Sequence, residues 1–369
     1  LDDSAATQLT GWSVVSDTEI TGANVPAGLK SGSYGVSVAS TLGTGATSAV
    51  KYTVTTPAPV VNDLSPAYGL TTSATTLSYI RGAGFYGGTT SSNVPAGTGV
   101  RLGDSATTAL SGWTVASNTE ITGAVVPTSL TAGYYNMLVS NDGGSNATST
   151  KKYAVLGPPV VSNMDAVTGL NTANTTLTVY GNYFADGAAV SVVTAVKLND
   201  IATTAISTYT VSSATLITGA VIPSGIKTGT YDIMVTTPAG TNAASGQKFV
   251  VSTVLADVTA ITPAVGNNTG PVTVDLTGSG FFGGTSSPNV LDIRLNDAGN
   301  TQLTGYAVAS DTAITDAVVP SQVKAGTYSV KITNSGGANT TSTAKYTVTT
   351  AAPTISGVNP AAGFTDLAT

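Results

Sequence analysis

The segment LGDSATTALSGWTVASNTEITGAVVPTSLTAGYYNMLVSNDGGSNATSTKKYAV, residues 102–155, decides the fold because the chain repeats it. Its opening Leu-x-Asp motif recurs at spacings of 101, 96 and 97 residues, at Leu1/Asp3, Leu102/Asp104, Leu198/Asp200 and Leu295/Asp297. The later landmarks, which keep these spacings, are a Val/Ile-Pro pair ending at Pro26, Pro127, Pro223 and Pro320, a Gly-x-Tyr at Tyr34, Tyr135, Tyr231 and Tyr328, and an aromatic residue at Tyr52, Tyr153, Phe249 and Tyr346. A register held over so many positions indicates tandem structural repeats.

The other half of each unit precedes this segment. It occupies residues 59–85, recurs at 159–184 and at 261–281, and begins again with Pro353, Pro360 and Gly363. We therefore predict the C-terminal part of one repeat at residues 1–56, whole repeats at 57–156, 157–252 and 253–350, and the opening strands of a further repeat at 351–369.

The short segments inside each unit have the pattern of half-buried β-strands. Apolar and polar residues alternate at 231–235 and 328–332, and Asn-Gly-type turns such as residues 141–144 lie between such segments. No segment shows a sustained apolar face at helical spacing. Six or seven short strands in about a hundred residues are typical of an immunoglobulin-like sandwich. The predicted fold is all-β, with tandem immunoglobulin-like sandwiches arranged as beads on a string and joined by short proline-bearing linkers such as residues 54–59.

The order of these motifs resembles the IPT/TIG family, an immunoglobulin-like module of plexins, Rel-type transcription factors and many microbial surface proteins. The shared pattern is a proline-bearing first strand, Pro-x-x-Gly, Gly-x-x-Phe, Leu-x-Asp, Val-Pro, Gly-x-Tyr and an Asn-x-Gly-Gly turn, all found within residues 60–155. Transcription-factor members carry basic DNA-contacting loops and plexin-type neighbours often carry cysteines. Neither feature is present, so the resemblance implies the microbial surface group and an IPT/TIG-type repeat.

The composition argues against most catalytic and nucleic-acid functions. The 369 residues contain no cysteine and no histidine, and charged residues are only 9% of the chain. Thiol nucleophiles, imidazole bases and the usual zinc ligands are therefore excluded. The thirteen Lys and Arg residues are scattered, so nothing in the sequence would neutralise a row of phosphates. We expect no enzyme activity, no cofactor, no metal site, no nucleic-acid partner and no membrane insertion by this segment.

The repeated aspartates have two interpretations. Asp3, Asp104, Asp200 and Asp297 could each supply an oxygen ligand to calcium, or each could shape a hairpin turn. One carboxylate per unit is fewer than a calcium site needs, so the turn is favoured. Glu19 and Glu120 share one repeat position that holds Leu216 and Ala313 in the other units, and we interpret them as solvated surface residues.

The repeated aromatic residues also have two interpretations. Tyr34, Tyr135, Tyr231 and Tyr328 could stack on sugars or form the tyrosine corner of a sandwich fold, and the corner is favoured because each starts an alternating strand. Trp12, Trp113, Tyr209 and Tyr306 share another position, where one aromatic per domain favours a core plug over a carbohydrate platform. The glycine-rich runs at 82–88 and 278–284 precede no helix, so we expect loops or bulges and no phosphate site.

The function predicted from these features is structural. We expect an extracellular, cell-surface repeat protein that forms a stalk, surface layer or filament of a microbial cell and associates with itself head-to-tail or laterally. The alternative is a carbohydrate- or host-protein-binding accessory or adhesin region of a larger secreted protein. Four Asn-x-Ser/Thr sequons make Asn146, Asn174, Asn267 and Asn339 candidate N-glycosylation sites.

Both chain ends are expected to fall inside a domain, and two explanations stay open. The chain is either a window in a longer repeat array, which we favour, or residues 353–369 dock into the incomplete N-terminal unit of the next subunit.

Overall fold

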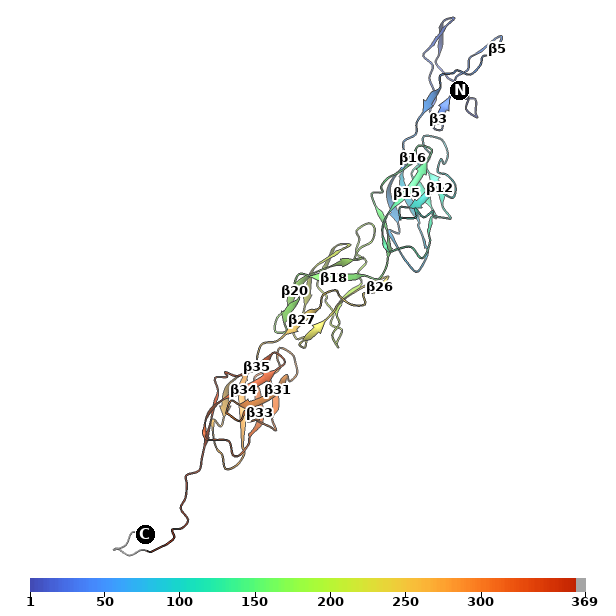
Figure 1. Ribbon diagram of the computed structural model, residues 1–369. Coiled ribbons are helices and arrows are strands. Elements are labelled where there is room, and N and C mark those ends of the chain that lie inside the picture. The colour runs from blue at the N-terminus through green and yellow to red at the C-terminus, as the bar shows by residue number, and fades with distance from the viewer. Residues whose placement is uncertain (363–369) are drawn as a thin grey trace.

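The computed structural model describes residues 1–362, and these form a row of separate all-β units (Figure 1). Three units carry a full set of strands, from Val60 to Leu156, from Val160 to Ser252 and from Asp257 to Thr349, and are called repeats 1, 2 and 3. Each encloses its own cluster of buried apolar side chains. The all-β, tandem immunoglobulin-like architecture predicted from the sequence is confirmed.

Repeat 1 is a sandwich of two main sheets. Its strands are β7 (Val60–Ser65), β8 (Tyr68–Leu70), β9 (Thr75–Thr76), β10 (Tyr79–Ala83), β11 (Val100–Leu102), β12 (Thr114–Ser117), β13 (Glu120–Thr122), β14 (Val125–Val126), β15 (Gly133–Asn141), β16 (Gly144–Ser145) and β17 (Lys152–Leu156). One sheet has the order β12-β13-β10-β7 and the other β11-β15-β17-β8, while β9 pairs with β14 and β16 with β15. The last strand, β17, runs parallel to β8 and antiparallel to β15.

Repeat 2 has the same strand order. Its strands are β18 (Val160–Met164), β19 (Thr168–Leu170), β20 (Thr175–Asn182), β21 (Ala195–Leu198), β22 (Thr210–Ser213), β23 (Leu216–Ile222), β24 (Gly229–Tyr231), β25 (Ile233–Thr237), β26 (Gly240–Thr241) and β27 (Phe249–Ser252). The first sheet is β18-β20-β23-β22. The second face consists of β19-β27-β24 and β21-β25-β26.

Repeat 3 closes the series of complete sandwiches. Its strands are β28 (Asp257–Thr262), β29 (Val265–Asn267), β30 (Val272–Ser279), β31 (Val290–Leu295), β32 (Ala307–Ser310), β33 (Ala313–Val319), β34 (Gly326–Asn334), β35 (Gly337–Asn339) and β36 (Lys345–Thr349). The sheets are β28-β30-β33-β32 and β29-β36-β34-β31, and β35 pairs with β34. Apolar residues alternate inward along each strand, as on β30, where Val274 and Leu276 are 1% exposed.

The N-terminal unit, residues 1–56, contains counterparts of only the second half of a repeat. Its strands are β1 (Ser13–Ser16), β2 (Glu19–Thr21), β3 (Gly32–Tyr34), β4 (Ala39–Ser40), β5 (Gly43–Thr44) and β6 (Tyr52–Val54). Without counterparts of β7 and β10 in this unit, its inner face is open to solvent. Tyr52 is 45% exposed where Tyr153, its counterpart in repeat 1, is 1% exposed.

The C-terminal segment lies at the other end of the row. Residues 351–362 are extended and exposed and contain no paired strand, and Gly363 of the predicted opening strands lies outside the described residues. Ile355 is 85% exposed and Val358 is 70% exposed, whereas their counterparts Val61 and Leu64 on β7 are 1% and 2% exposed. This apolar pair lacks the sheet partners that β10 supplies to β7 in repeat 1.

Candidate functional site

The repeated aspartates form one turn four times. In each unit the Asp Oδ1 accepts a hydrogen bond from the backbone N–H of the Thr four residues later, and Oδ2 accepts one from that Thr hydroxyl. For Asp297 and Thr301 these distances are 2.7 and 2.9 Å. Burial raises the pKa of Asp297, but the hydrogen bonds from Thr301 outweigh this, so its pKa lies below the ordinary value. The turn interpretation is confirmed, because both carboxylate oxygens have partners within the chain.

The repeated tyrosines form a corner in every unit. Each hydroxyl donates to the backbone carbonyl four residues earlier, at 2.8–2.9 Å, in the pairs Tyr34/Lys30, Tyr135/Thr131, Tyr231/Lys227 and Tyr328/Lys324. The glycine two residues before each tyrosine leaves room for the ring. A Cβ at Gly229, for example, would lie 2.7 Å from the Tyr231 hydroxyl. The predicted tyrosine corner is confirmed.

We expect Tyr231→Phe to destabilise repeat 2 by about 0.5–1.5 kcal/mol, because the Lys227 carbonyl loses its donor. The measurement is denaturant unfolding followed by circular dichroism. The matched control is Tyr180→Phe, whose ring lies on the outer face of the same repeat and is 41% exposed. Equal losses in the two variants would contradict the corner's role.

The second series of aromatic residues packs against the cores. Trp113, Tyr209 and Tyr306 are half-buried and lie against the apolar clusters of repeats 1, 2 and 3. The Trp113 Nε1–H donates to the Leu110 carbonyl at 3.1 Å. Trp12 of the N-terminal unit is 54% exposed. The core-plug interpretation is therefore confirmed in the three complete repeats, and the N-terminal unit leaves the same position open.

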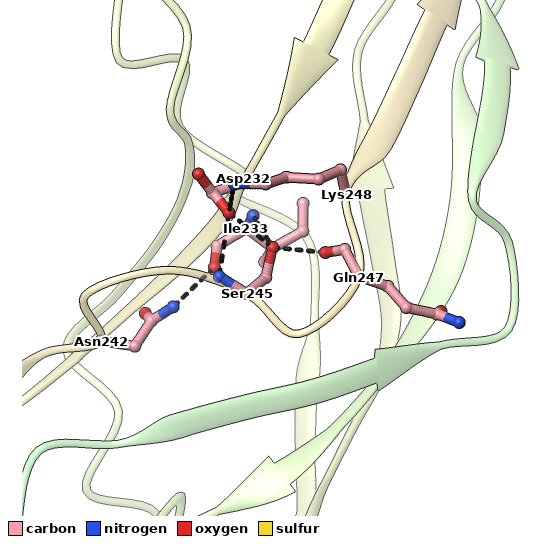
Figure 2. Close-up of polar contacts among 6 residues, drawn as sticks. All are labelled: Asp232, Ile233, Asn242, Ser245, Gln247 and Lys248. Atoms are coloured by element: carbon pink, nitrogen blue, oxygen red, sulfur yellow. Dashed lines mark hydrogen bonds and ion pairs between the residues drawn. The ribbon is translucent and has the colours of Figure 1, made fainter.

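The densest polar cluster surrounds Ser245 in repeat 2 (Figure 2). The Ser245 hydroxyl accepts from the Ile233 N–H at 3.3 Å, donates to the Gln247 carbonyl and lies 3.0 Å from Asp232 Oδ1. The Lys248 ammonium forms an ion pair with Asp232 at 2.5 Å. Burial raises the pKa of Asp232, but the hydrogen bonds from Lys248 and Ser245 outweigh it, so this pKa is lowered.

The serine of this cluster recurs in the other units, whereas its acidic neighbour does not. Ser48 and Ser149 occupy the same position and accept from the Val36 and Met137 N–H groups at 2.9 and 3.0 Å, in units that have Gly35 or Asn136 where repeat 2 has Asp232. The serine therefore supports a backbone N–H wherever the fold recurs. Ser245 is itself 6% exposed, and this arrangement is structural support.

The junction between repeats 1 and 2 is a built interface. The Tyr134 hydroxyl donates to the Ala185 carbonyl at 2.7 Å, and its ring stacks on Tyr183 with centroids 6.1 Å apart. Burial, and then the charges of Tyr183 and Asp186, raise the pKa of Tyr134 to about 12. Apolar side chains from both repeats complete the interface, namely Ala154, Leu156, Tyr68 and Leu70 from repeat 1 and Val192 and Ala239 from repeat 2.

Tyr183 shows that this contact is specific. It has a φ of 66°, a left-handed conformation that costs a non-glycine residue about 1–2 kcal/mol. The same position in repeats 1 and 3 is glycine, Gly84 with a φ of 82° and Gly280 with a φ of 73°. Only in repeat 2 does the position carry a large side chain, and there the ring packs on the preceding repeat. The stacking and burial of Tyr183 offset its backbone strain.

The other two junctions are held by polar contacts. At the first, the Ser31 N–H donates to Asp142 Oδ2 at 2.6 Å and the Ser31 hydroxyl donates to the Asp142 carbonyl at 3.1 Å. Burial raises the pKa of Asp142, but these bonds outweigh it and the pKa is lowered. Between repeats 2 and 3, Asn171 Nδ2 donates to the Gly283 carbonyl. Leu170, the counterpart of Leu70, remains 46% exposed there, so this junction lacks the apolar seal of the first pair of repeats.

Two asparagines fix the linkers where they enter a repeat. Asn141 Nδ2 donates at 3.0 Å to the carbonyls of Pro57 in the linker and Gly84 in the loop after β10. Asn334 does the same in repeat 3, with Val254 and Gly280 as acceptors. Their buried amides hold the incoming chain against the sandwich, which limits the freedom of each linker.

The candidate glycosylation sites differ in accessibility. Asn146 is 8% exposed, and its Nδ2 donates to the carbonyls of Met137 and Thr148. A glycan on this nitrogen would replace one of its two hydrogens and so remove at least one of these bonds, and the buried site leaves no room for a sugar, so the folded repeat opposes modification at Asn146. Asn174 and Asn267 have exposed side chains, and the Asn339 Nδ2 is half-buried and bonded to Asp257 Oδ1 at 2.9 Å.

The junction contacts have little signal in the sequence. The shared motifs lie within the repeats, whereas the junctions use residues in which the repeats differ. The one available signal was Tyr183, a tyrosine where the other repeats have glycine. The described residues 1–362 contain no group of three acidic, cysteine or histidine side chains placed to hold a metal ion. The same residues include no helix that is long and apolar enough to cross a membrane.

Comparison with known proteins finds similarity to solved structures and no family or curated relative. No family model matches this sequence, and no curated protein matches it. Among solved structures, the chain is similar to the plexin A4 extracellular region, with 13% sequence identity and a TM-score of 0.28; the match covers 72% of this chain and 21% of the plexin chain. It is also similar to three immunoglobulin domains of titin, with 15% identity and a TM-score of 0.31; that match covers 80% of this chain and 97% of the titin chain. A third similar structure is the SGBP-B protein of a Bacteroides ovatus mixed-linkage glucan utilization locus, solved with a mixed-linkage heptasaccharide. Its sequence identity is 15% and its TM-score 0.19, and the match covers 80% of this chain and 67% of that chain. The chain spans about a fifth of the length of the plexin structure, and all of these likenesses are distant.

Proposed function

We propose that this chain is a structural repeat region on the outside of a microbial cell, forming part of a stalk, surface layer or filament. The observation that carries the proposal is the serial arrangement of complete sandwiches that contact one another end to end (Figure 1). Repeated domains of this kind create length from one architecture. We further propose that the repeats are of the IPT/TIG type, because two of the motifs that carry that resemblance, Leu-x-Asp and Gly-x-Tyr, form the same turn and corner in every unit.

The proposal includes no catalytic role. The polar groups that recur in every unit support the backbone, as the Asp-Thr turns and the tyrosine corners do. Exposed Asn174 and Asn267 are the preferred candidates for glycan attachment, and sugar there would add solubility to a surface that carries few charges.

Small-angle X-ray scattering tests the stalk. A compact globule of this length would have a radius of gyration of about 21 Å. Since the repeats follow one another in a row, we expect a clearly larger value and an elongated distance distribution for the isolated chain. A value close to the compact estimate would contradict the proposal.

A carbohydrate- or host-protein-binding role is the second candidate, favoured by one observation. A shallow hollow of about 390 Å³ borders Trp113 and is lined by residues 96–97 and 109–113. Aromatic rings beside hollows can stack on sugar rings. Affinity electrophoresis in soluble polysaccharides, comparing the native chain with Trp113→Ala, would show retardation that the variant loses if the hollow binds sugar; because Trp113 also packs against the core, circular dichroism must show that the variant remains folded. Identical mobility in every gel would remove the carbohydrate form of this candidate.

A further inference from the structure

The outer face of the first sheet of repeat 1 carries a row of alternating charges. Glu120 on β13, Arg81 on β10 and Asp63 on β7 are direct Cα partners across three neighbouring strands. Lys151, immediately before β17, extends the row beyond Asp63. Read across the sheet, the signs are negative, positive, negative and positive.

The row is organised by contacts within the repeat. The Arg81 Nε–H donates to Glu120 Oε2 at 2.8 Å, and the Lys151 ammonium lies 2.7 Å from Asp63 Oδ1. The Arg81 guanidinium also lies 4.0 Å above the centre of the Tyr79 ring, whose hydroxyl donates to Asp63 Oδ2 at 3.4 Å. Stacking on the tyrosine holds the arginine flat along the sheet. The charged side chains nevertheless stay 32–53% exposed and available to a partner.

The fold does not require this row, because the other repeats lack it. The positions of Glu120, Arg81, Asp63 and Lys151 are occupied in repeat 2 by Leu216, Tyr180, Asn163 and Gln247, and in repeat 3 by Ala313, Thr277, Ala260 and Ala344. Those repeats form the same sheet. In a chain with only 9% charged residues, four charges in one register on one repeat point to recognition.

The sequence of signs is complementary to itself when reversed. A second copy placed face to face, and related by a two-fold axis parallel to the strands, presents Lys151 to Glu120 and Asp63 to Arg81. The same contacts recur on the other side of the axis, as an isologous interface requires. The strands of the two copies then run in the same direction. Each charge gains a second opposite neighbour without losing the one within its own chain.

The surroundings of the row allow two such faces to approach closely. Four outward residues beside the row on β10, β12 and β13 are small, namely Ala83, Thr114, Ala116 and Thr122. The large outward residue on β10 is Tyr79, whose ring is covered by the Arg81 guanidinium. The charged row, together with this ring, is therefore the feature that projects from this face. We propose that this face of repeat 1 is a lateral contact surface for a second copy of the chain. The inference rests on the proposed structural function and names the surface by which neighbouring chains associate.

Each exposed ion pair contributes little binding free energy and is screened by salt. The contact between two copies is therefore weak by itself, and it becomes stronger when many copies associate side by side. Sedimentation velocity of the full chain tests it. We expect self-association at about 20 mM salt that is lost at about 500 mM salt, where the Debye length falls to a few ångströms.

Charge-swap variants identify the surface. The double variant E120R/R81E keeps the net charge, the 120–81 pair and the Asp63–Lys151 pair, but its row reads positive, negative, negative, positive and opposes itself on reversal. We expect its association constant to fall at least about tenfold, or about 1.4 kcal/mol. The quadruple variant E120R/R81E/D63K/K151E again alternates in sign and should regain association with itself. It should not associate with the native chain, because the facing charges of that pair are alike.

A milder variant keeps the test valid if the charge-swap variants fail to fold. Lys151→Gln introduces the residue found at this position in repeat 2 and should weaken association without disturbing the fold, as circular dichroism would show. Association that persists unchanged in the double variant would overturn the inference, because another surface would then be responsible. A native chain that is elongated in scattering yet monomeric at low salt would also overturn it while leaving the stalk proposal standing. A compact chain would instead defeat the stalk.

Discussion

Phe281→Ala is expected to lower the stability of repeat 3 by about 3–5 kcal/mol. The ring is fully buried among the apolar residues that join the two sheets of the repeat, so its removal leaves a cavity at the centre of the core. Tandem repeats with separate cores unfold separately, and amide hydrogen exchange read by mass spectrometry can assign the loss to one repeat. We expect faster exchange across residues 257–349 and unchanged exchange in repeats 1 and 2.

The adjacent phenylalanine is the control. Phe282 is half-buried, and its backbone N–H is held by Asp311 Oδ1 at 2.8 Å whatever its side chain. Phe282→Ala should therefore cost clearly less than Phe281→Ala. Comparable losses in the two variants would show that Phe281 is not the core residue of this repeat.

Gly278→Ala should be nearly as severe, with a loss of about 3 kcal/mol. A Cβ at this position would lie 1.9 Å from the Asp257 carbonyl oxygen, across the bulge at which β30 pairs with β28. The Asp257 carbonyl is part of the backbone and cannot move aside as a side chain can by changing rotamer. Strands β28 and β30 must therefore separate locally. In the same way, a Cβ at Gly82 or Gly181 would lie 1.8 Å from the carbonyl oxygen of Val60 or Val160.

Thermal unfolding followed by circular dichroism measures this loss, with Gly270→Ala as the control. A Cβ at Gly270 meets no atom within 4 Å, and its φ lies outside the left-handed region. The control should therefore melt within about a degree of the native chain, in keeping with the small effects of unconstrained surface substitutions. If both alanine variants melted alike, the close approach of β28 and β30 at the bulge would be refuted.

The features shared by all repeats were predictable from the sequence because each has a local cause. The aspartate turn closes within four residues and the tyrosine corner reaches back four residues, so spacing alone predicts them. A glycine also recurs at the bulge between the two paired strands of the first sheet, at Gly82, Gly181 and Gly278. Loop and strand positions followed from the alternation of apolar residues within each unit.

The contacts that distinguish the repeats were less accessible to sequence reasoning. Glu120 was interpreted as a solvated surface residue, and it is half exposed in an ion pair with Arg81, 39 positions away. That neighbour is set by the pairing register of β10 with β13, which no local pattern specifies. Tyr134 and Tyr183 likewise belong to different repeats and meet only because of how two sandwiches dock.

The parallel pairing of β8 with β17, repeated as β19 with β27 and β29 with β36, determines how each repeat bears tension. The chain enters repeat 1 through β7, which pairs with β10, reaches β8 two residues later and leaves just after β17. Once the load has passed β7, a pull on the two ends slides β8 along β17. The bonds between them, such as Ala154 N–H to the Ala67 carbonyl and Thr71 N–H to the Leu156 carbonyl, are loaded together and do not open one after another. Resistance to such a load is set by the rate of forced unfolding. Under tension along its length, each repeat therefore resists unfolding by the shear strength of this strand pair. The load passes through the junctions to the next repeat in series.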